Sequence, residues 1–359
     1  MSGERSTHIR TMYWSSLSAS RSEHNSVHWL CMTIEEHVPL APLTTFGLGG
    51  AARFLLRVGD VVQLQEAITF AQEKKLNTLL LGGGSNLLVG DGGFDGLVIK
   101  IEMRGVVQDG DTLVAGAGES WDALVARSVA DGLWGLENLS GIPGTVGAAP
   151  IQNIGAYGAE VADTLAWLDA FDTHEDKTVR FLAQECGFAY RTSRFKQESG
   201  RYVVLQVAFA LKKNGVPNLS YKDLAGLKQP TLAGIRAQVL SVRAQKFPDL
   251  AKEGTAGSFF LNPIVSGEVA GRLAAQYPEL PQFPAEGGVK LSLAWLLDEV
   301  LHLKGARVGG ARTFERQPLV LVATPDARAG DVCALAEQIK KEAKEKLGIE
   351  IQEEVRIVR

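Results

Sequence analysis

Apolar residues recur at helical spacing between Val61 and Lys75, where Val61, Leu64, Ile68 and Ala71 share one face. This period predicts an amphipathic helix that ends at a lysine pair. A second helix is predicted after Ser120, a favourable N-cap residue, and Gly132 stands where a left-handed C-terminal cap would end it.

Short apolar runs between these helices predict strands. They cover Thr78 to Leu81, Gly96 to Ile101, the stretch Val106 to Ala115 with an Asp-Gly turn inside it, and the alternating run Arg201 to Leu211. The last of these closes a first domain, which we place at residues 38–212 with an internal division near residue 103.

The Lys-Lys-Asn-Gly-Val-Pro segment from Lys212 is the best candidate for a linker. Beyond it we predict a second domain at 213–347, with helices near Val269 to Gln276, Ser292 to Leu301 and Ala334 to Leu347. Residues 348–359 form a final strand, because Ile349 to Val358 alternates between apolar and polar residues.

The first 37 residues carry no such pattern. Up to Cys31 they are rich in Ser, His and Arg and lack the apolar core of a signal peptide. We expect a disordered extension, or a segment upstream of the true start, since Met32 directly precedes the first patterned sequence.

Composition narrows the class of protein. The chain has 359 residues, 45% hydrophobic and 22% charged, which indicates a globular protein with more than one domain. A formal net charge of -4 argues against a nucleic-acid partner. No run of about eighteen apolar residues predicts a membrane span.

Three cysteines, Cys31, Cys186 and Cys333, lie far apart and form no CxxC pair. They predict neither a metal site nor a disulfide framework and favour a reducing cytoplasm. Nothing in the sequence demands an oligomer, so a monomer is expected.

Two glycine-rich stretches, Gly82 to Leu87 and Ser140 to Pro150, lie in the first domain. Glycine lets backbone N–H groups approach an anionic ligand closely, so two such loops point to a dinucleotide pyrophosphate. The first loop lacks the third glycine and the acidic residue of the Rossmann fingerprint, which disfavours NAD bound in that manner.

Longer strings then carry a specific resemblance. TTFGLGGAARF, LLLGGGSNLLV, GLENLSGIPGTVGAAPIQNIGAYGAEV, YRTSRFK, GTAGSFFLNP and QEEVRIV resemble, in this order, the UDP-N-acetylenolpyruvoylglucosamine reductase (UDP-N-acetylmuramate dehydrogenase) family. They span Pro42 to Val358. LSYKDL around Tyr221 resembles the branch that carries a substrate-covering tyrosine loop.

The resemblance implies an α+β fold, in which a vanillyl-alcohol-oxidase/PCMH-like FAD-binding domain of two α/β subdomains precedes a C-terminal α/β domain that binds the substrate. It also implies noncovalent FAD, with NADPH as the co-substrate that reduces it. The residues implied around FAD are Gly82, Gly83, Gly84, Ser85, Asn86, Leu87, Gly141, Ile142, Pro143, Gly144, Gly147, Ala148, Ala149, Ile151 and Gln152.

In the resembled enzymes the flavin, once reduced, passes hydride from N5 to the enolpyruvyl methylene carbon of UDP-N-acetylglucosamine enolpyruvate, giving UDP-N-acetylmuramate for peptidoglycan. Three matching positions imply the remaining chemistry. Ser258 matches the proton donor, Arg191 the guanidinium that holds the developing carboxylate charge, and Glu354 its acidic partner.

Read singly, each of these residues has an ordinary structural interpretation, as a turn serine, a surface arginine or a solvent-facing glutamate. Glu353 is the alternative to Glu354, since a shift of one residue in a strand would turn it to the site. The Glu-Val-Arg spacing favours Glu354.

For the UDP-sugar, the matching positions are Tyr157, Tyr221, Lys246, Asn262 and Gln317. Lys246 offers a point charge suited to pyrophosphate, and Tyr221 is expected to fold over the nucleotide as a lid. Tyr221 read locally could equally be a packed core tyrosine.

One position departs from the family's pattern, because Thr44 stands where Asn is usual before Thr45 and Phe46. No histidine or cysteine lies in either glycine loop, so covalent flavin attachment has no evident nucleophile.

Two alternatives remain open. One is another FAD enzyme of the same fold, an oxidase or dehydrogenase of an alcohol or lactone. The other is a catalytically silent nucleotide-sugar binding protein.

Overall fold

The structure, a computed structural model, describes residues 33–359. The extension predicted for residues 1–37 therefore lies outside the described residues up to position 32. Its last part needs correction, since strand β1 (Glu35–Pro39) pairs with β2 (Ala51–Val58). This strand lies at the edge of its sheet and is only half-buried, so it can contain the polar residues Glu35, Glu36 and His37. Its sequence therefore lacks the apolar pattern of a strand.

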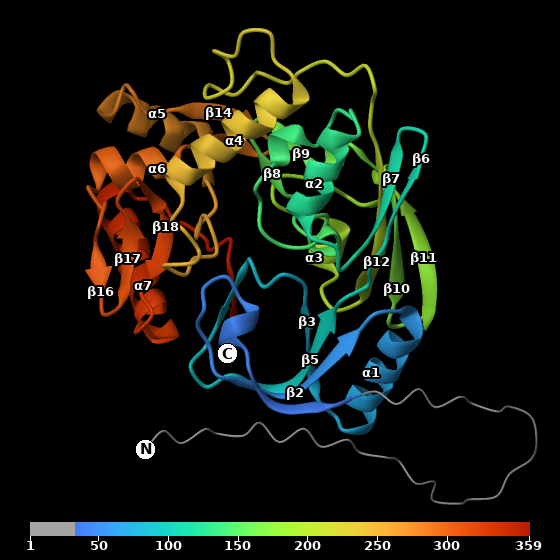
Figure 1. The fold of residues 1–359 in the computed structure, drawn as a ribbon. Coiled ribbons are helices and arrows are strands. Elements are labelled where there is room, and N and C mark those ends of the chain that lie inside the picture. The colour runs from blue at the N-terminus through green and yellow to red at the C-terminus, as the bar shows by residue number, and fades with distance from the viewer. Residues whose placement is uncertain (1–32) are drawn as a thin grey trace, which may run out of the picture.

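The first subdomain is a four-stranded sheet with one covering helix (Figure 1). Its strand order is β1-β2-β5-β3, where β3 is Asn77–Leu81 and β5 is Phe94–Ile101, and both neighbours of β5 run parallel to it. Helix α1 (Val61–Glu73) is capped at its N-terminus by Asp60, whose carboxylate accepts a hydrogen bond from the Gln63 N–H at 2.8 Å. Its apolar face enters the core through Leu64, Ala67 and Ala71, as the helical period predicts.

The second subdomain is an antiparallel sheet of order β11-β10-β12-β7-β6. Its strands are β6 (Val106–Asp109), β7 (Thr112–Gly116), β10 (Leu165–Asp172), β11 (Lys177–Leu182) and β12 (Tyr202–Ala210). Helix α2 (Trp121–Ala130) is capped by Ser120, and Gly132 follows it with a φ of 72°. Two short strands, β8 (Gly155–Ala156) and β9 (Ala159–Glu160), and helix α3 (Arg194–Gln197) complete it.

Four 3₁₀ turns link the strands of the second subdomain, and another lies near the start of the described chain. They are η1 (Ala41–Leu43), η2 (Glu137–Leu139), η3 (Val146–Ala148), η4 (Val161–Asp163) and η5 (Ala183–Glu185).

One continuous hydrophobic core joins these two subdomains. It runs from Leu56 and Ile99 in the first sheet to Trp121 in α2 and Phe209 in β12. The division predicted near residue 103 thus separates two sheets, but no break in packing accompanies it.

The segment after the first domain carries helix α4 (Leu232–Lys246), which packs on the second subdomain. Ile235, Val239 and Val242 of α4 share a small core with Tyr157. The boundary at 212/213 remains a prediction, and by its contacts α4 belongs with the second subdomain.

Two three-stranded sheets and three helices form the rest of the C-terminal part. One sheet has the order β13-β15-β14 and the other β16-β17-β18. The elements are β13 (Ile264–Val265), α5 (Gly267–Gln276), β14 (Gln282–Ala285), β15 (Gly288–Leu291), α6 (Leu293–Trp295), β16 (Arg307–Val308), β17 (Ala311–Phe314), β18 (Gln317–Ala323) and α7 (Ala329–Leu347).

Two elements differ from their predicted form. The helix expected at Ser292 to Leu301 is one α-helical turn followed by a π-helical turn, Leu296–Val300. The strand expected at Ile349 to Val358 is regular only in β19 (Arg356–Val358), although Ile349, Ile351 and Val355 are buried as its alternation predicts. Before β19 the chain forms single bridges instead, such as Phe260 with Glu353.

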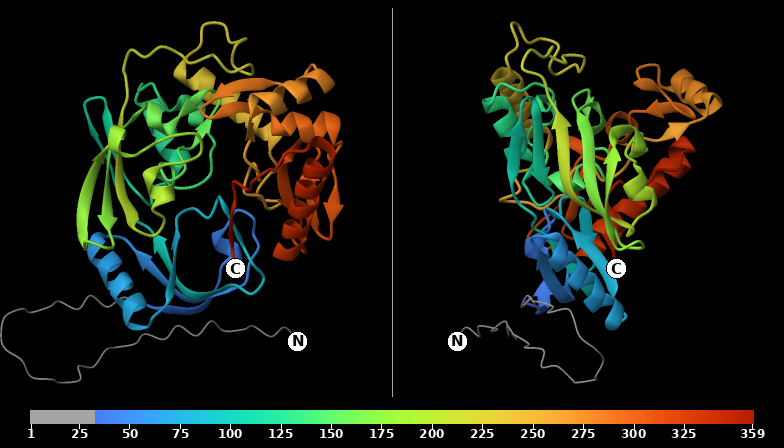
Figure 2. Two further views of the ribbon diagram at one scale, coloured as in Figure 1. Left: turned by 180° about the vertical axis from the view of Figure 1, so that it is seen from behind. Right: turned by 90° about the vertical axis from the view of Figure 1, so that its right-hand side faces the viewer.

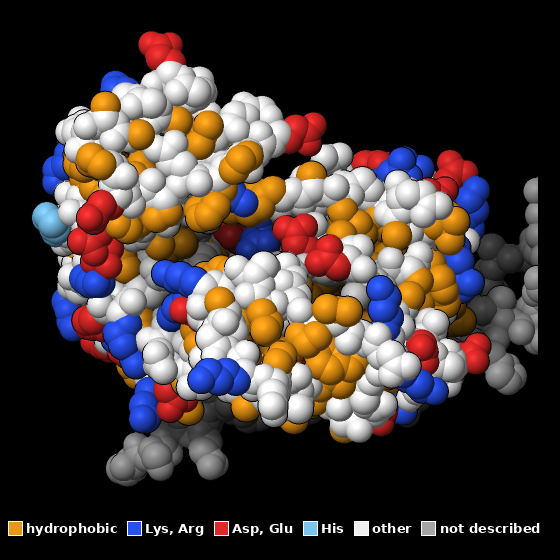
Figure 3. Space-filling view, turned by 90° about the horizontal axis from the view of Figure 1, so that it is seen from above, with side chains coloured by type: hydrophobic (Ala, Val, Ile, Leu, Met, Phe, Trp, Pro, Cys, Tyr) orange, Lys and Arg blue, Asp and Glu red, His pale blue; other side chains and the backbone are white. Residues whose placement is uncertain are grey.

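Strand β19 closes the molecule, because it pairs in parallel with β4 (Leu87–Val89), directly after the first glycine loop. The second subdomain and the C-terminal part stand side by side above the first subdomain in Figure 1 and in the view from behind (Figure 2, left). Seen from above, the surface is hollowed between them, with charged side chains of both signs inside (Figure 3).

Candidate functional site

An ion pair joins two residues that the sequence analysis predicted as catalytic. Arg191 Nε lies 2.9 Å from Glu354 Oε1, and the two side chains are only 20% and 13% exposed. Arg191 comes from the loop before α3, and Glu354 from the segment before β19. The tertiary structure thus brings together two motifs that are far apart in sequence.

The guanidinium of Arg191 is held from a second side. Its Nη2 donates to the Gly155 carbonyl at 2.8 Å, which fixes the plane of the guanidinium. The backbone of Arg191 has a φ of 54°, a left-handed conformation that is uncommon for residues other than glycine. Strained backbone of this kind persists only where its surroundings enforce it.

Glu354 is fixed by its backbone and by two side chains of the glycine-loop regions. Its N–H donates to the Phe259 carbonyl at 2.8 Å, and its own carbonyl accepts from Asn86 Nδ2 at 3.1 Å. Asn86 also donates to Gln152 Oε1 at 2.8 Å, and Gln152 Nε2 lies 3.4 Å from Glu354 Oε1. A chain of hydrogen bonds therefore connects both glycine loops to this carboxylate.

Burial raises the pKa of Glu354, and the nearby charges of Arg191 and Lys196 oppose this without cancelling it. The neighbouring Glu353 has a different partner, Lys340 of α7, whose Nζ lies 2.9 Å from it. Of the two glutamates, Glu354 is the one beside Arg191.

Ser258 lies one residue before Phe259, whose carbonyl accepts the Glu354 N–H. It forms an isolated bridge with Val320 of β18, and Gly257 before it has a φ of 80°. Ser258 is half-buried, and its neighbour Phe259, not Ser258 itself, forms the backbone hydrogen bonds to the segment that carries Glu354.

The two glycine loops meet. A Cβ added to Gly83 would lie 2.6 Å from Gly144 Cα, so no larger residue could occupy position 83 without moving the other loop. Gly82, Gly83, Gly84, Ser85 and Asn86 connect β3 to Leu87 at the start of β4, whereas Gly141 to Gly144 lead into η3, which holds Gly147 and Ala148.

Several polar groups at this meeting point lack a partner within residues 33–359. The backbone N–H groups of Gly83, Gly84 and Ser85 donate no hydrogen bond there, and the buried Thr45 hydroxyl, beside Gly84, has none. Adjacent unpaired N–H groups form a cradle for anions. This donor set fits the pyrophosphate of a dinucleotide, as the composition of the loops predicts.

A cavity of about 110 Å³ lies under these loops. Gly82 of the first loop and Thr145, Ala148 and Ile151 of the second line it, together with Val204 of β12. It opens between the two subdomains, where a bound ring system would contact both.

The predicted substrate residues Tyr157, Tyr221 and Lys246 form a second group. The two tyrosine rings pack edge to face with centroids 5.2 Å apart, and Lys246 Nζ lies 5.6 Å from the Tyr221 centroid. Lys246 is ion-paired with Asp223. Tyr221 is 36% exposed, so it is not a core tyrosine.

Tyr157 is held by a residue that the sequence analysis did not identify. Burial raises the pKa of Tyr157 to about 12, and Arg243 of α4 opposes that shift. Arg243 is buried against Tyr157 and against Gly141 of the second loop. Burial lowers the pKa of Arg243 as well.

Asn262 and Gln317 complete the predicted set. Asn262 Oδ1 accepts the Leu293 N–H at 3.0 Å, and its own N–H lies 3.4 Å from the Tyr190 hydroxyl, next to Arg191. Gln317 begins β18 and is half-buried. Asn262 thus reaches the first group of residues, whereas Gln317 has no side-chain contact to either group among the interactions of the described residues.

Four residues that contact these groups were not predicted, namely Tyr190, Lys196, Asp223 and Arg243. Tyr190 and Lys196 lie inside the YRTSRFK string and Asp223 inside LSYKDL, so their motifs were available as a signal. Arg243 carries no local signal, because it faces the second loop only through the packing of α4.

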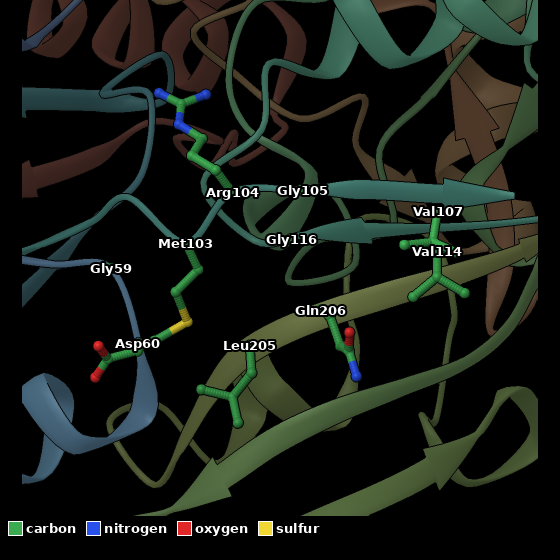
Figure 4. Close-up of a pocket in the computed structure, with 10 residues that line it drawn as sticks. All are labelled: Gly59, Asp60, Met103, Arg104, Gly105, Val107, Val114, Gly116, Leu205 and Gln206. Atoms are coloured by element: carbon green, nitrogen blue, oxygen red, sulfur yellow. The ribbon is translucent and has the colours of Figure 1, made fainter.

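Another pocket, of about 270 Å³, lies where the first subdomain passes into the second (Figure 4). Asp60 and Met103 line it together with Leu205 and Gln206 of β12. It contains none of the predicted site residues, which gather at the meeting point of the glycine loops.

In the part of the chain from residue 33 onward, no helix is both long and apolar enough to cross a bilayer.

Comparison with known proteins agrees with the two-part organisation. Residues 52–181 match the family described as FAD binding domain, and residues 249–358 match UDP-N-acetylenolpyruvoylglucosamine reductase, C-terminal domain.

Relatives named UDP-N-acetylenolpyruvoylglucosamine reductase match nearly the whole chain. One from Neisseria gonorrhoeae is 43% identical over 86% of this chain and 92% of its own length. One from Pseudomonas putida is 41% identical over 90% of this chain and 99% of its own.

The crystal structure of UDP-N-acetylenolpyruvylglucosamine reductase from Thermus caldophilus superposes with a TM-score of 0.68 at 28% identity, covering 91% of this chain and all of that one. The predicted α+β fold, with an FAD-binding domain followed by the C-terminal domain of this family, is confirmed. The chain belongs to the UDP-N-acetylenolpyruvoylglucosamine reductase family of FAD-dependent oxidoreductases.

Proposed function

We propose that this protein uses NADPH, through noncovalently bound FAD, to reduce UDP-N-acetylglucosamine enolpyruvate to UDP-N-acetylmuramate for peptidoglycan. The observation that carries the proposal is the ion pair of Arg191 with Glu354. Its hydrogen-bonded links run to both glycine loops and, through Phe259, to the segment of Ser258.

FAD would lie on the first loop, from Gly82 to Leu87, and the second, from Gly141 to Gln152. The unpaired N–H groups of Gly83, Gly84 and Ser85 would receive its pyrophosphate. When bound, FAD supplies the hydride that N5 delivers to the enolpyruvyl methylene carbon. All other steps fall to side chains.

Charge develops on the carbon next to the substrate carboxylate during this reaction. Arg191 is suited to hold that carboxylate, because a guanidinium offers two parallel donors and keeps its charge at neutral pH. Glu354 orients Arg191 and, at its raised pKa, shares a proton more readily than an exposed glutamate. Ser258 would then give its proton to the carbon.

Tyr157, Tyr221, Lys246, Asn262 and Gln317 would bind the UDP-sugar. Lys246 is suited to the pyrophosphate, and substrate entry would exchange its ion pair with Asp223 for one with phosphate. Tyr221, with an exposed face, would close over the nucleotide. Monomeric state and a location in the bacterial cytoplasm stay predictions from the sequence.

The test separates the two half-reactions in the absence of oxygen. Purified protein is expected to be yellow and to release flavin in acid. NADPH should bleach the flavin of wild type and of Ser258→Ala equally. Addition of UDP-N-acetylglucosamine enolpyruvate should then restore the oxidised spectrum of wild type, and do so about 10²-fold more slowly in the variant, the usual contribution of a general acid.

Reoxidation of Ser258→Ala at the wild-type rate would contradict only the proposed role of Ser258 as proton donor, and not the proposed reaction. Colourless wild-type protein, or reduced wild type that the substrate fails to reoxidise, would contradict the proposed function as a whole.

A further inference from the structure

Lys196 contacts the proposed catalytic pair but has no assigned task. Its Nζ donates to the Arg191 carbonyl at 2.9 Å. Arg191 is one of the residues other than glycine whose backbone is left-handed, with a φ of 54°. A strong donor therefore holds the carbonyl of a residue in an uncommon conformation, and the position of its guanidinium depends on that conformation.

The backbone position of Lys196 is set by α3. Ser193 caps α3, accepts the Lys196 N–H at 3.3 Å, and donates its own hydroxyl to the Ile151 carbonyl at 2.6 Å. Ser193 is buried, and Ile151 belongs to the second glycine loop. The helix turn that carries Lys196 is thus attached to the loop beside the proposed flavin site.

Lys196 also contributes charge at Glu354. The charged groups that act on this carboxylate are Arg191 and Lys196, while the facing Gln152 and Asn86 are neutral. Tyr190 is a further titratable neighbour: burial raises the pKa of its hydroxyl, Arg191 opposes that shift, and Glu354 adds to it. Burial lowers the pKa of Lys196, and Glu354 opposes that shift.

We propose that Lys196 is a positioning residue, which holds Arg191 in the backbone conformation from which its guanidinium meets Glu354 and which adds a second positive charge beside that carboxylate. This inference rests on the proposed function. The alternative is a surface lysine whose hydrogen bond contributes nothing to the reaction, since Lys196 is exposed.

The experiment compares Lys196→Met, Lys196→Arg and a matched control, Lys177→Met, on full-length flavin-loaded protein. Lys177 is a lysine of strand β11 whose side chain is 60% exposed. In Lys196→Met, NADPH should reduce the flavin within about twofold of the wild-type rate, whereas reoxidation by the enolpyruvyl substrate should slow about ten- to a hundredfold, as expected when a hydrogen bond to a charged group is lost. Lys196→Arg should recover most of this rate, and Lys177→Met should match wild type.

A pH profile of reoxidation distinguishes positioning from general damage. Loss of the ammonium leaves Glu354 with one positive neighbour instead of two, which raises the pKa of Glu354. The limb of the pH–rate profile that reports this carboxyl group is the one that Glu354→Gln abolishes, and it should move to higher pH in Lys196→Met. In Lys196→Arg that limb should stay where wild type has it.

Reoxidation of Lys196→Met at the wild-type rate with an unmoved limb would overturn the inference, while wild-type turnover would leave the proposed function intact. If Lys196→Met loses its flavin, Lys196→Arg decides the matter. Rescue by arginine supports positioning, and a slow Lys196→Arg enzyme with bound flavin overturns it. Failure of both wild type and Lys177→Met to reoxidise would instead contradict the proposed function.

Discussion

At the scale of single residues, two adjacent glutamates have different partners. Glu354, with its side chain 13% exposed, pairs with Arg191, whereas Glu353, 25% exposed, pairs with Lys340 of α7. Successive side chains of an extended segment point to opposite sides, so one-residue register decides which glutamate reaches the cleft.

We predict that Glu354→Gln slows substrate-driven flavin reoxidation about 10²-fold, because an unbalanced Arg191 loses its orientation in a buried site. Glu353→Gln is the matched control and should stay within about twofold of wild type, since its partner is Lys340 of α7 and not Arg191, and a partly exposed ion pair contributes little. Stopped-flow absorbance of the reduced enzyme measures both. An equal loss of reoxidation rate in the two variants would show that the effect does not come from the ion pair of Glu354 with Arg191.

Most of this residue-scale picture was accessible from motifs. The strings around Arg191 and Glu354 predicted two residues that form an ion pair, and the string around Ser258 contains Phe259, whose carbonyl accepts the Glu354 N–H. Their roles remain predictions. Arg243 was not accessible, because only the packing of α4 places it on Gly141 and Tyr157.

At the scale of elements, an ion pair holds α4 against α2 beside the second glycine loop. Arg236 of α4 donates two hydrogen bonds to Asp122 of α2, at 2.6 and 2.8 Å. Asp122 Oδ1 also accepts the Gly141 N–H at 2.5 Å. One carboxylate therefore joins two helices and the start of the loop.

We predict that Asp122→Asn lowers the free energy of unfolding by about 1–2 kcal/mol at neutral pH, a modest value because the Asp122 side chain is 34% exposed and water screens the pair. Burial alone would raise the pKa of Asp122, but Arg236 and the Gly141 N–H outweigh it and the pKa is lowered. A lowered folded-state pKa means that this stability is present above the unfolded-state pKa, about 3.9, and is lost as the pH falls through the folded-state value.

Urea unfolding at neutral and acidic pH measures the difference. Wild type and Asp122→Asn should converge as the pH falls below about 4. A gap of constant size at all pH values would show that the carboxylate charge is not its source.

The sequence predicted elements best where one face of a regular helix or strand is buried. Helix α1 follows its apolar period, whereas β12 lies within the predicted run but is buried at both successive and alternate positions. The helix at Ser292 and the strand at Ile349 were predicted with the right burial but the wrong backbone, because hydrophobic period reports which side chains are inside and not which hydrogen bonds the backbone forms.

At the scale of the whole molecule, the last residues join the C-terminal part to the first subdomain. Strand β19 lies parallel to β4, and Val358, 6% exposed, packs in the core of the first sheet. Phe46 and Leu88 of the first subdomain in turn enter the core of the C-terminal part. Each part thus supplies side chains to the other.

We predict that deletion of residues 356–359 destabilises the protein by about 3–5 kcal/mol, from the burial of Val358 and the lost ladder hydrogen bonds. Reoxidation by substrate should be abolished, because Glu354 loses the strand that anchors it. The matched control removes Arg359 alone, which is exposed, and should change the unfolding free energy by no more than about 0.5 kcal/mol.

Urea midpoints and flavin content measure both deletions. Wild-type stability of the longer deletion would contradict the stabilising role of the pairing between β19 and β4.

The sequence by itself determined the helices and strands with a strong apolar period, the two glycine loops and the family, because each depends on residues close together in the chain. Only the tertiary structure decided which glutamate meets Arg191, that α4 covers the second loop, and that β19 returns to β4. Those contacts join segments far apart in sequence, and their geometry follows from how whole elements pack, which no local pattern encodes.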